Sequence, residues 1–182
     1  IKAKLVRELD TKGLVGGDMH LHTYTNSGHG DATLEERVIS CAAEGLEWAV
    51  ATDHNFLTDY TPYLESVGLK GQMATTISNE VSTQIGHFNT YPLTAGTAPA
   101  DYTIKDGKKL FGHIRALAPK PVVIQINHPR WSSTDFFNIK ELDPYFGFSK
   151  HKEWSWNFDA IEVLNENYQL GWRIASNNKH AV

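Results

Sequence analysis

The sequence predicts an α/β fold in which strands alternate with helices, arranged either as a barrel or as an open sheet. Early in the chain, a helical pattern lies between two short apolar runs, and this strand–helix–strand order is typical of parallel strands. Histidine and acidic residues also follow closely on several strand-like runs. In both architectures, functional groups gather beyond the carboxyl ends of parallel strands. With 182 residues, the chain is long enough for a single domain with a sizeable core, and we expect one domain over 1–182.

The first third of the chain has the signals of a strand–helix–strand unit. Thr33 and Glu36 have the spacing of a capping box, so a helix should begin there. Gly45 can end this helix, because glycine readily adopts the left-handed conformation that often follows a last turn. The expected elements are a leading segment at 1–15, a strand at 19–22, a polar loop at 24–31, the helix, and a strand at 46–52.

The rest of the chain contains mostly strand patterns. Thr61 and Pro62 can start a short helix, since proline is favoured at the first helical position. The run 121–127 is continuously apolar, as expected of a strand buried on both faces. The other expected elements are strands at 73–80, 87–93 and 158–164, a helix at 104–117, and a helix or loop at 170–181.

Composition excludes several functional classes. The formal net charge of −4 argues against a non-specific binder of polyanions, so a nucleic-acid partner is not expected. The single cysteine, Cys41, excludes an internal disulfide and a cysteine-rich zinc module. No apolar run is long enough to span a bilayer, and no signal peptide is visible. The chain starts at Ile1 rather than methionine, so the missing signal peptide does not decide the compartment. The oligomeric state is not predicted from the sequence.

Two histidines, His20 and His22, form the most informative local motif. On an extended strand, side chains alternate between faces, so these two imidazoles should point to the same side. Met19 and Leu21 should point to the other side, toward packing. Two imidazoles on one face of one strand can chelate a metal ion.

Further candidate ligands come at or near the ends of later strand-like runs. His29 lies in a glycine-flanked loop, where it could be a ligand or simply face solvent. Imidazole suits Zn, Fe or Mn, and a carboxylate can bridge two ions. The complete set of predicted metal ligands is His20, His22, His29, His54, Glu80, His87 and His128. The remaining histidines, His113, His151 and His180, are interpreted as ordinary polar residues.

Two further residues are candidates for a catalytic role. Asp53 precedes His54 and could take part in catalysis, or it could orient an imidazole instead of binding metal itself. Arg130 follows His128 by two residues and could bind a substrate phosphate or carboxylate. An ion pair at the rim of the site is the alternative role for Arg130.

The segment 131–158 is long, irregular and aromatic. Its rings could form the wall of an apolar substrate pocket, or they could pack as a satellite core under a long loop. The residues concerned are Trp131, Phe136, Phe137, Tyr145, Phe146, Phe148, Trp154 and Trp156.

The order of these motifs resembles the PHP superfamily, the polymerase and histidinol phosphatase metal-dependent hydrolases. The resemblance rests on 18–23 (DMHLHT), 52–55 (TDHN), Glu80, 86–87 (GH) and 127–129 (NHP). The stretch 78–89 further resembles the branch that includes carbamate-insecticide hydrolases. The resemblance implies a distorted (β/α)7 barrel that holds two or three divalent ions.

The resemblance also implies how the ligands are shared. His20, His22 and Glu80 would hold one ion, and Glu80 with His87 and His128 a second. His54, with His29, would hold a third. The superfamily ends its motif set with an Asp-x-His pair that has no match here, because His180 lacks an aspartate two residues earlier. The resemblance therefore implies an incomplete barrel that lacks its last strands and one ligand to each of two ions.

These features predict an enzyme, a metal-dependent hydrolase that acts on a small ester substrate. The first hypothesis is a phosphoesterase in which a metal-bridging hydroxide attacks phosphorus. The same metal cluster acting on a carboxyl ester or carbamate is the enzymatic alternative. A degenerate barrel that serves as a binding or scaffold module is the non-catalytic alternative, and the missing Asp-x-His pair favours it. A polymerase-associated nuclease is disfavoured by the acidic charge.

Overall fold

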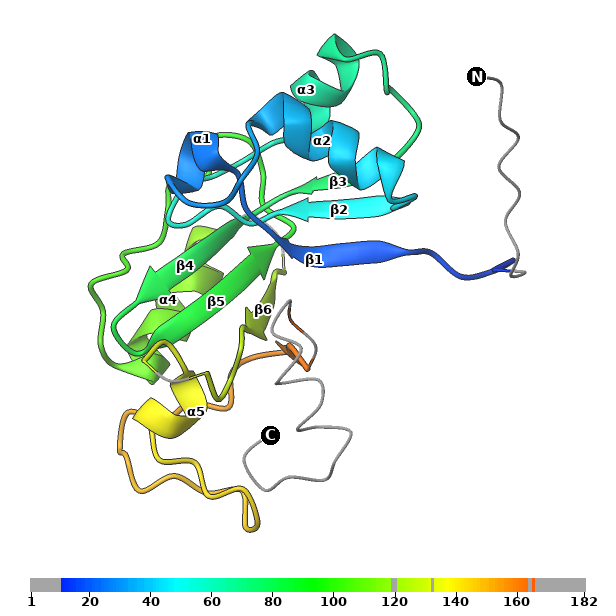
Figure 1. The fold of residues 1–182 in the computed structure, drawn as a ribbon. Coiled ribbons are helices and arrows are strands. Elements are labelled where there is room, and N and C mark those ends of the chain that lie inside the picture. The colour runs from blue at the N-terminus through cyan, green and yellow to red at the C-terminus, as the bar shows by residue number, and fades with distance from the viewer. Residues whose placement is uncertain (1–10, 119–120, 132, 164, 166–182) are drawn as a thin grey trace.

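The computed structural model describes residues 11–118, 121–131, 133–163 and 165, and its strands form two small sheets (Figure 1). A three-stranded sheet has the order β1-β2-β3, and all its strands are parallel. A four-stranded sheet has the order β4-β5-β6-β7, with β4, β5 and β6 antiparallel and β7 parallel to β6. The strands are β1 (Gly17–Leu21), β2 (Trp48–Ala51), β3 (Ala74–Ile77), β4 (Asn79–Thr83), β5 (Gly86–Tyr91), β6 (Val123–Ile126) and β7 (Ala160–Ile161).

The predicted strand–helix–strand unit is confirmed by β1, α2 (Leu34–Ala43) and β2, whose two strands are parallel. The capping box is present: the Thr33 side chain accepts a hydrogen bond from the Glu36 backbone, and the Glu36 carboxylate accepts one from the Thr33 backbone. The predicted start with proline holds for α3 (Thr61–Ser66). Helices α2 and α3 lie together over one side of the three-stranded sheet, and their apolar side chains form its core with the strands (Figure 1).

The helix predicted at 104–117 is α4 (Gly107–Leu117), which starts later because Asp106 caps it through a hydrogen bond from the Lys109 backbone. This helix packs against the four-stranded sheet and contributes Leu110, Phe111 and Ile114 to the larger core. Two single-turn helices, α1 (Tyr24–Ser27) and α5 (Phe136–Ile139), lie in segments that the sequence suggested were irregular.

The aromatic segment divides between the core and the surface. Phe136, Phe137 and Trp154 are buried in the same cluster as the strand residues, with the Phe136 and Trp154 rings stacked at 4.8 Å. Their packing favours the core interpretation over a pocket wall, although this core is the main one and not a satellite. Four other aromatic residues of the segment are exposed: Tyr145, Phe146, Phe148 and Trp156.

The predicted (β/α)7 barrel is wrong: the two sheets form no closed barrel over the described residues. A barrel of that class needs parallel strands, and a parallel connection needs a crossover of about a dozen residues. Between β4 and β5 there are only Gln84 and Ile85, so the two strands must form an antiparallel hairpin. The single strand predicted at 73–80 is also two strands, because the chain changes sheets at Ser78.

Two elements are predicted near the C-terminus, and the structure describes one of them. The strand predicted at 158–164 is the short β7, and the element predicted at 170–181 lies outside the described residues. In the described part of the chain, no helix combines the length and apolarity that crossing a bilayer would require.

Candidate metal centre

The structure brings all seven predicted metal ligands together, although they come from six separate segments of the chain. They form three overlapping groups, and within each group the potential ligand atoms lie within 4.8 Å of one another. The groups are His22–His29–His54, His20–Glu80–His128 and His54–Glu80–His87. Because Glu80 and His54 each belong to two groups, the seven residues make one continuous cluster and not three separate sites.

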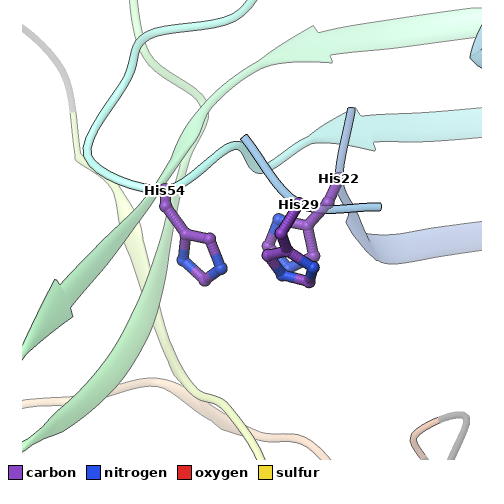
Figure 2. A group of neighbouring side chains, drawn as sticks. All are labelled: His22, His29 and His54. Atoms are coloured by element: carbon purple, nitrogen blue, oxygen red, sulfur yellow. The ribbon is translucent and has the colours of Figure 1, made fainter. Parts of the chain in front are cut away.

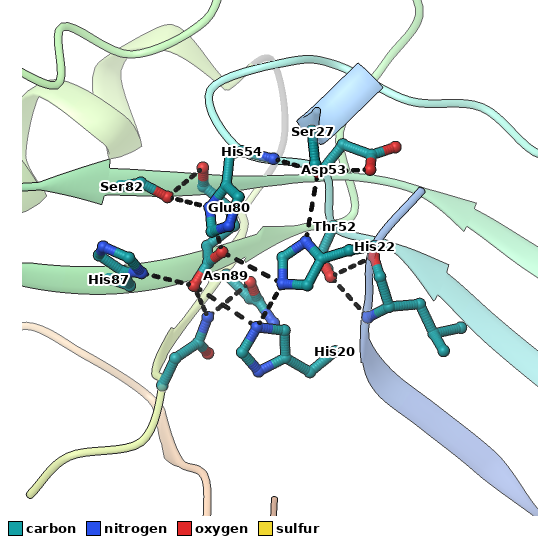
Figure 3. Close-up of polar contacts among 12 residues, drawn as sticks. His20, His22, Ser27, Thr52, Asp53, His54, Glu80, Ser82, His87 and Asn89 are labelled. Carbon is teal, nitrogen blue, oxygen red and sulfur yellow. Dashed lines mark hydrogen bonds and ion pairs between the residues drawn. The ribbon is translucent and has the colours of Figure 1, made fainter. Parts of the chain in front are cut away.

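Glu80 lies at the centre of this cluster and has no exposed surface (Figure 3). Its carboxylate is surrounded by imidazole nitrogens that belong to five histidines. The distances are 3.5 Å from Oε1 to His20 Nε2, 3.5 Å from Oε2 to His22 Nε2, 2.6 Å from Oε2 to His54 Nδ1, 3.2 Å from Oε1 to His87 Nδ1, and 3.7 Å from Oε1 to His128 Nε2.

The backbone of Glu80 makes two hydrogen bonds with the segment after β2. Its N–H donates to the Asp53 carbonyl at 3.0 Å, and its carbonyl accepts from Asn55 N–H at 2.8 Å. These bonds form an isolated bridge between His54 and Glu80 and join the segment after β2 to the start of β4. The central carboxylate therefore sits where the two sheets meet.

His20 and His22 point to the same side, as the alternation predicted, and their Nε2 atoms are 3.0 Å apart. The strand itself ends at Leu21, one residue earlier than predicted, so His22 lies just beyond it. The register between β1 and β2 shifts between Asp18 and Leu21, and the Asp18 carboxylate accepts a hydrogen bond from the His20 backbone at 2.9 Å.

The imidazole rings of His22, His29 and His54 form a triangle, in which His54 stacks against the other two rings and His22 is tilted relative to His29 (Figure 2). The ring centroids are 4.8 Å apart for His22 and His29, 4.4 Å for His22 and His54, and 4.9 Å for His29 and His54. His29 is exposed, so this group forms the solvent side of the cluster.

Asp53 is fully buried, and its carboxylate contacts hydroxyl groups and backbone instead of imidazole. It accepts from Thr23 N–H and from the Ser27 hydroxyl, both at 2.6 Å, and from the Thr58 hydroxyl at 2.7 Å. Ser27 Oγ in turn accepts from the His54 backbone at 3.1 Å and lies 3.4 Å from His22 Nδ1. This geometry favours the orienting role over a direct role in the chemistry.

Arg130 does not contact any of the seven candidate ligands. Its guanidinium donates to Asn138 Oδ1 at 2.8 Å and to the Leu142 carbonyl at 3.0 Å, and it lies over the Phe137 ring. Burial lowers the pKa of Arg130, against the opposing effect of Asp135 and Asp143. These contacts brace α5 and the loop after it and are not a rim ion pair, while the binding of a substrate phosphate or carboxylate by Arg130 stays a prediction.

Two histidines interpreted as ordinary residues have partners outside the cluster. His113 accepts a hydrogen bond from the Asp101 backbone through Nε2 at 3.1 Å. His151 lies 3.8 Å from carboxylate oxygens of Glu141 and Glu153. The third, His180, lies outside the described residues.

Glu162 is the participant that sequence reasoning missed. It lies directly after β7, with Oε1 2.8 Å from His20 Nδ1, and Oε2 accepts from the His128 backbone at 2.6 Å. A polar residue just after a strand is the signal that predicts several of the other ligands. The strand predicted at 158–164 places Glu162 inside the strand, whereas β7 ends at Ile161.

A chain of buried amides also supports Glu80 and was not predicted. Asn127 Nδ2 donates to Glu80 Oε1 and to Asn89 Oδ1, both at 2.8 Å. Asn89 Nδ2 continues the chain to the Met19 carbonyl at 2.7 Å, and Gln125 donates to Asn127 Oδ1 at 3.1 Å. Asn89 on β5 pairs in register with both Glu80 on β4 and Gln125 on β6, and Asn127 directly follows β6. Reading them from the sequence would have required knowing the antiparallel register.

The charges of the cluster are strongly coupled. Burial alone would raise the pKa of Glu80, but its close contacts with the imidazoles of His128, His20, His54 and His87 hold that pKa well below its ordinary value. Burial opposes protonation of His20 as well, yet its contacts with Glu162 and Glu80 raise its pKa to about 10. Burial, together with repulsion from neighbouring histidines, outweighs the attraction of Glu80 and lowers the pKa of His22 to about 3.

The residues present fit a metal ion. Glu80 Oε2 and His87 Nδ1 are buried and make no hydrogen bond of acceptable geometry, although nitrogen or oxygen atoms lie close to both. Ligands held at about 2.0–2.1 Å from one ion lie roughly 3.0–3.4 Å apart, and several N···N and N···O distances here are near that range. The protein thus has His/Glu groups that could hold a metal ion.

No protein-family model matches the chain, and no curated protein matches it significantly. A functional assignment must therefore start from the geometry of this cluster.

Proposed function

We propose that the protein is a metal-dependent hydrolase that acts on small phosphoesters and uses two or three divalent ions, with Zn, Mn or Fe as the candidates. The observation that carries the proposal is the buried Glu80 carboxylate, whose two oxygens face five imidazoles within 3.7 Å. The order of the motif residues, which resembles that of the PHP superfamily, supports the same assignment, although the sheets form no barrel within the residues that the structure describes.

The residues of the cluster have complementary roles in this proposal. Bound divalent ions would make a water nucleophilic near neutral pH and stabilise charge that develops on the attacked group. Glu80 would bridge neighbouring positions, because both of its oxygens lie near separate sets of imidazoles. The exposed His29 marks the side from which substrate would approach. Asp53 would hold the loops that carry His22 and His54 through Ser27.

A carboxyl ester or carbamate is the second candidate substrate, and the placement of Arg130 favours it. A phosphoester brings negative charge that an arginine commonly binds, and the Arg130 guanidinium is committed to Asn138 and Leu142. A neutral ester would not need that cation.

The first test compares the wild-type protein with a His20→Ala/His22→Ala variant. We expect two or three transition-metal ions per wild-type chain by plasma mass spectrometry and at least one fewer in the variant. Hydrolysis of bis(p-nitrophenyl) phosphate should fall by on the order of 100-fold or more, because charge stabilisation in the transition state is lost. Circular dichroism establishes that both proteins are folded.

A His113→Ala/His151→Ala variant is the matched control, since it also removes two histidines but leaves the cluster intact. It should keep the wild-type metal content and rate. Hydrolysis of p-nitrophenyl acetate without any phosphodiester hydrolysis would select the ester candidate instead. Metal binding without hydrolysis of either compound would favour the non-catalytic module, and a wild-type chain without metal would contradict the whole proposal.

A further inference from the structure

We propose that Glu162 is a positioning residue of the metal centre, whose carboxylate selects the nitrogen that His20 offers to an ion and fixes the backbone that carries His128. This rests on the metal binding proposed above and adds a residue outside the seven candidate ligands.

One oxygen of Glu162 determines the orientation of His20. An ionised carboxylate only accepts hydrogen bonds, so the 2.8 Å contact with Oε1 requires His20 Nδ1 to carry the proton. Nε2 is then left facing Glu80 Oε1 at 3.5 Å and His22 Nε2 at 3.0 Å. A carboxylate on the far nitrogen of a metal-binding histidine fixes both the tautomer and the ring orientation.

The other oxygen of Glu162 holds His128. Oε2 accepts the His128 backbone N–H at 2.6 Å. His128 has φ of +27°, a conformation that non-glycine residues seldom adopt and that needs support from its surroundings. The charge-assisted bond supplies that support and places His128 Nε2 3.7 Å from Glu80 Oε1. One carboxylate therefore positions two members of the His20–Glu80–His128 group.

Strand pairing brings Glu162 to this place. Ile161 pairs with Ile126 in the parallel β6–β7 register, and the Glu162 N–H donates to the Ile126 carbonyl at 2.9 Å. Glu162 consequently lies beside 127–128, and its side chain is only 7% exposed. Asn165 also donates to Oε2 at 3.0 Å. The buried carboxylate therefore has two contacts with the cluster and one with Asn165, whose amide also lies 3.4 Å from His20 Nδ1.

Asp159 provides a matched comparison on the same segment. Its Oδ2 accepts from the Ile124 backbone at 2.8 Å and from Arg115 at 2.9 Å. Like Glu162, it ties the last described segment to β6, but it contacts no candidate ligand. Substitution of Asp159 should therefore show what is lost when the attachment of this segment to β6 is weakened without any change at a candidate ligand.

The test compares Glu162→Gln with Asp159→Asn. Glutamine keeps the shape of glutamate but offers one acceptor oxygen, whereas His20 Nδ1 and His128 N–H require two. We expect Zn²⁺ affinity, measured by competition with a chromophoric chelator, to weaken by about 10–100-fold in Glu162→Gln at unchanged stoichiometry. The Zn²⁺ affinity of Asp159→Asn should stay within about twofold of the wild-type affinity, while its free energy of unfolding, measured by urea denaturation, should fall. In the zinc-loaded protein, the slowly exchanging Nδ1–H proton of His20 should be visible by NMR in wild type and Asp159→Asn, and lost in Glu162→Gln.

Three results would overturn the inference. The first is Glu162→Gln affinity within about twofold of wild type, and the second is an equal loss of affinity in both variants, which would reduce Glu162 to a structural contact. The third is a drop in zinc stoichiometry, which would make Glu162 a ligand. A wild-type chain that binds no zinc is a separate failure, because it removes the proposed metal binding itself.

Discussion

Burying the Glu80 carboxylate would cost several kcal/mol if it had no partners, because an ionised group loses its hydration in the interior. Here the Asn127 amide and the surrounding imidazoles offset that loss. The arrangement keeps Glu80 ionised and makes the metal-free cluster a proton-binding site as well. Protons and metal ions should therefore compete for the same atoms.

Competition with protons gives a prediction for His20. Its pKa of about 10 exceeds the ordinary 6.5, so the folded metal-free protein holds this proton between those pH values. The resulting stabilisation is fully present below pH 6.5 and is lost as the pH rises through 10. An ion that takes Nε2 must displace the proton, so zinc binding at pH 8 should release about one proton from this group. Calorimetric titration in buffers of different ionisation enthalpy measures the release, and a binding heat that is independent of buffer would contradict it.

At the residue scale, the sequence predicted those ligands that stand in local motifs or directly after a strand. His20 and His22 needed only the alternation of a strand, and His128 follows the apolar run of β6. Glu162 and Asn127 could not be assigned their roles, because those roles depend on which strands pair. Pairing is set by contacts between residues far apart in sequence, and local patterns do not record them.

Among the elements, the β4–β5 hairpin decides the architecture. Its turn ends at Gly86, which has φ of +134°, a conformation that is strained for any L side chain. A Cβ atom there would lie 2.9 Å from Phe136 Cβ and 3.0 Å from Phe136 N. The glycine thus lets the hairpin approach α5 closely. In the register of this hairpin, Glu80 on β4 pairs with Asn89 on β5.

A Gly86→Ala substitution should destabilise the protein by about 2–4 kcal/mol, because the strained backbone and the clash with Phe136 add together. Urea denaturation measures the change. Gly96→Ala is the matched control: its φ of +83° is also positive, but a Cβ atom there would meet nothing within 4 Å. Equal losses in the two variants would show that the contact with Phe136 contributes nothing.

The elements that could be predicted are those with signals in adjacent residues. The capping box at Thr33 and the proline of α3 each specify a helix start within a single turn. The break at Ser78 has no glycine or proline to mark it, and strand-forming residues lie on both sides of it, at 75–77 and at Val81. Its position depends on the Thr58 backbone, which bonds to Ser78, and on Leu93, which bonds to Ile77.

At the scale of the whole molecule, the cluster lies between two sheets that each have a hydrophobic core of their own. The two sheets have distinct cores, one beneath α2 and α3 and one around α4. His20 belongs to the first sheet, while Glu80 and His87 belong to the second. An ion bound among them would therefore tie both sheets together.

Removal of metal should consequently destabilise the entire fold. A ligand present at about 100 times its dissociation constant stabilises the native state by about 2.7 kcal/mol. We expect a chelator to lower the Tm of the wild-type protein by several degrees in differential scanning calorimetry, and re-addition of zinc to restore it. The His20→Ala/His22→Ala variant should respond less. An identical wild-type Tm with and without chelator would contradict the link between the cluster and the fold.

The spacing of the cluster along the chain also has a consequence for synthesis. His20 and His22 are two residues apart, but the contact between His20 and Glu162 spans 142 residues. At about 10 residues per second, a ribosome would take roughly 14 s to make the intervening chain. During that interval the other candidate ligands would be added one after another, from His29 to His128, and the carboxylate that orients His20 would be made after all seven of them.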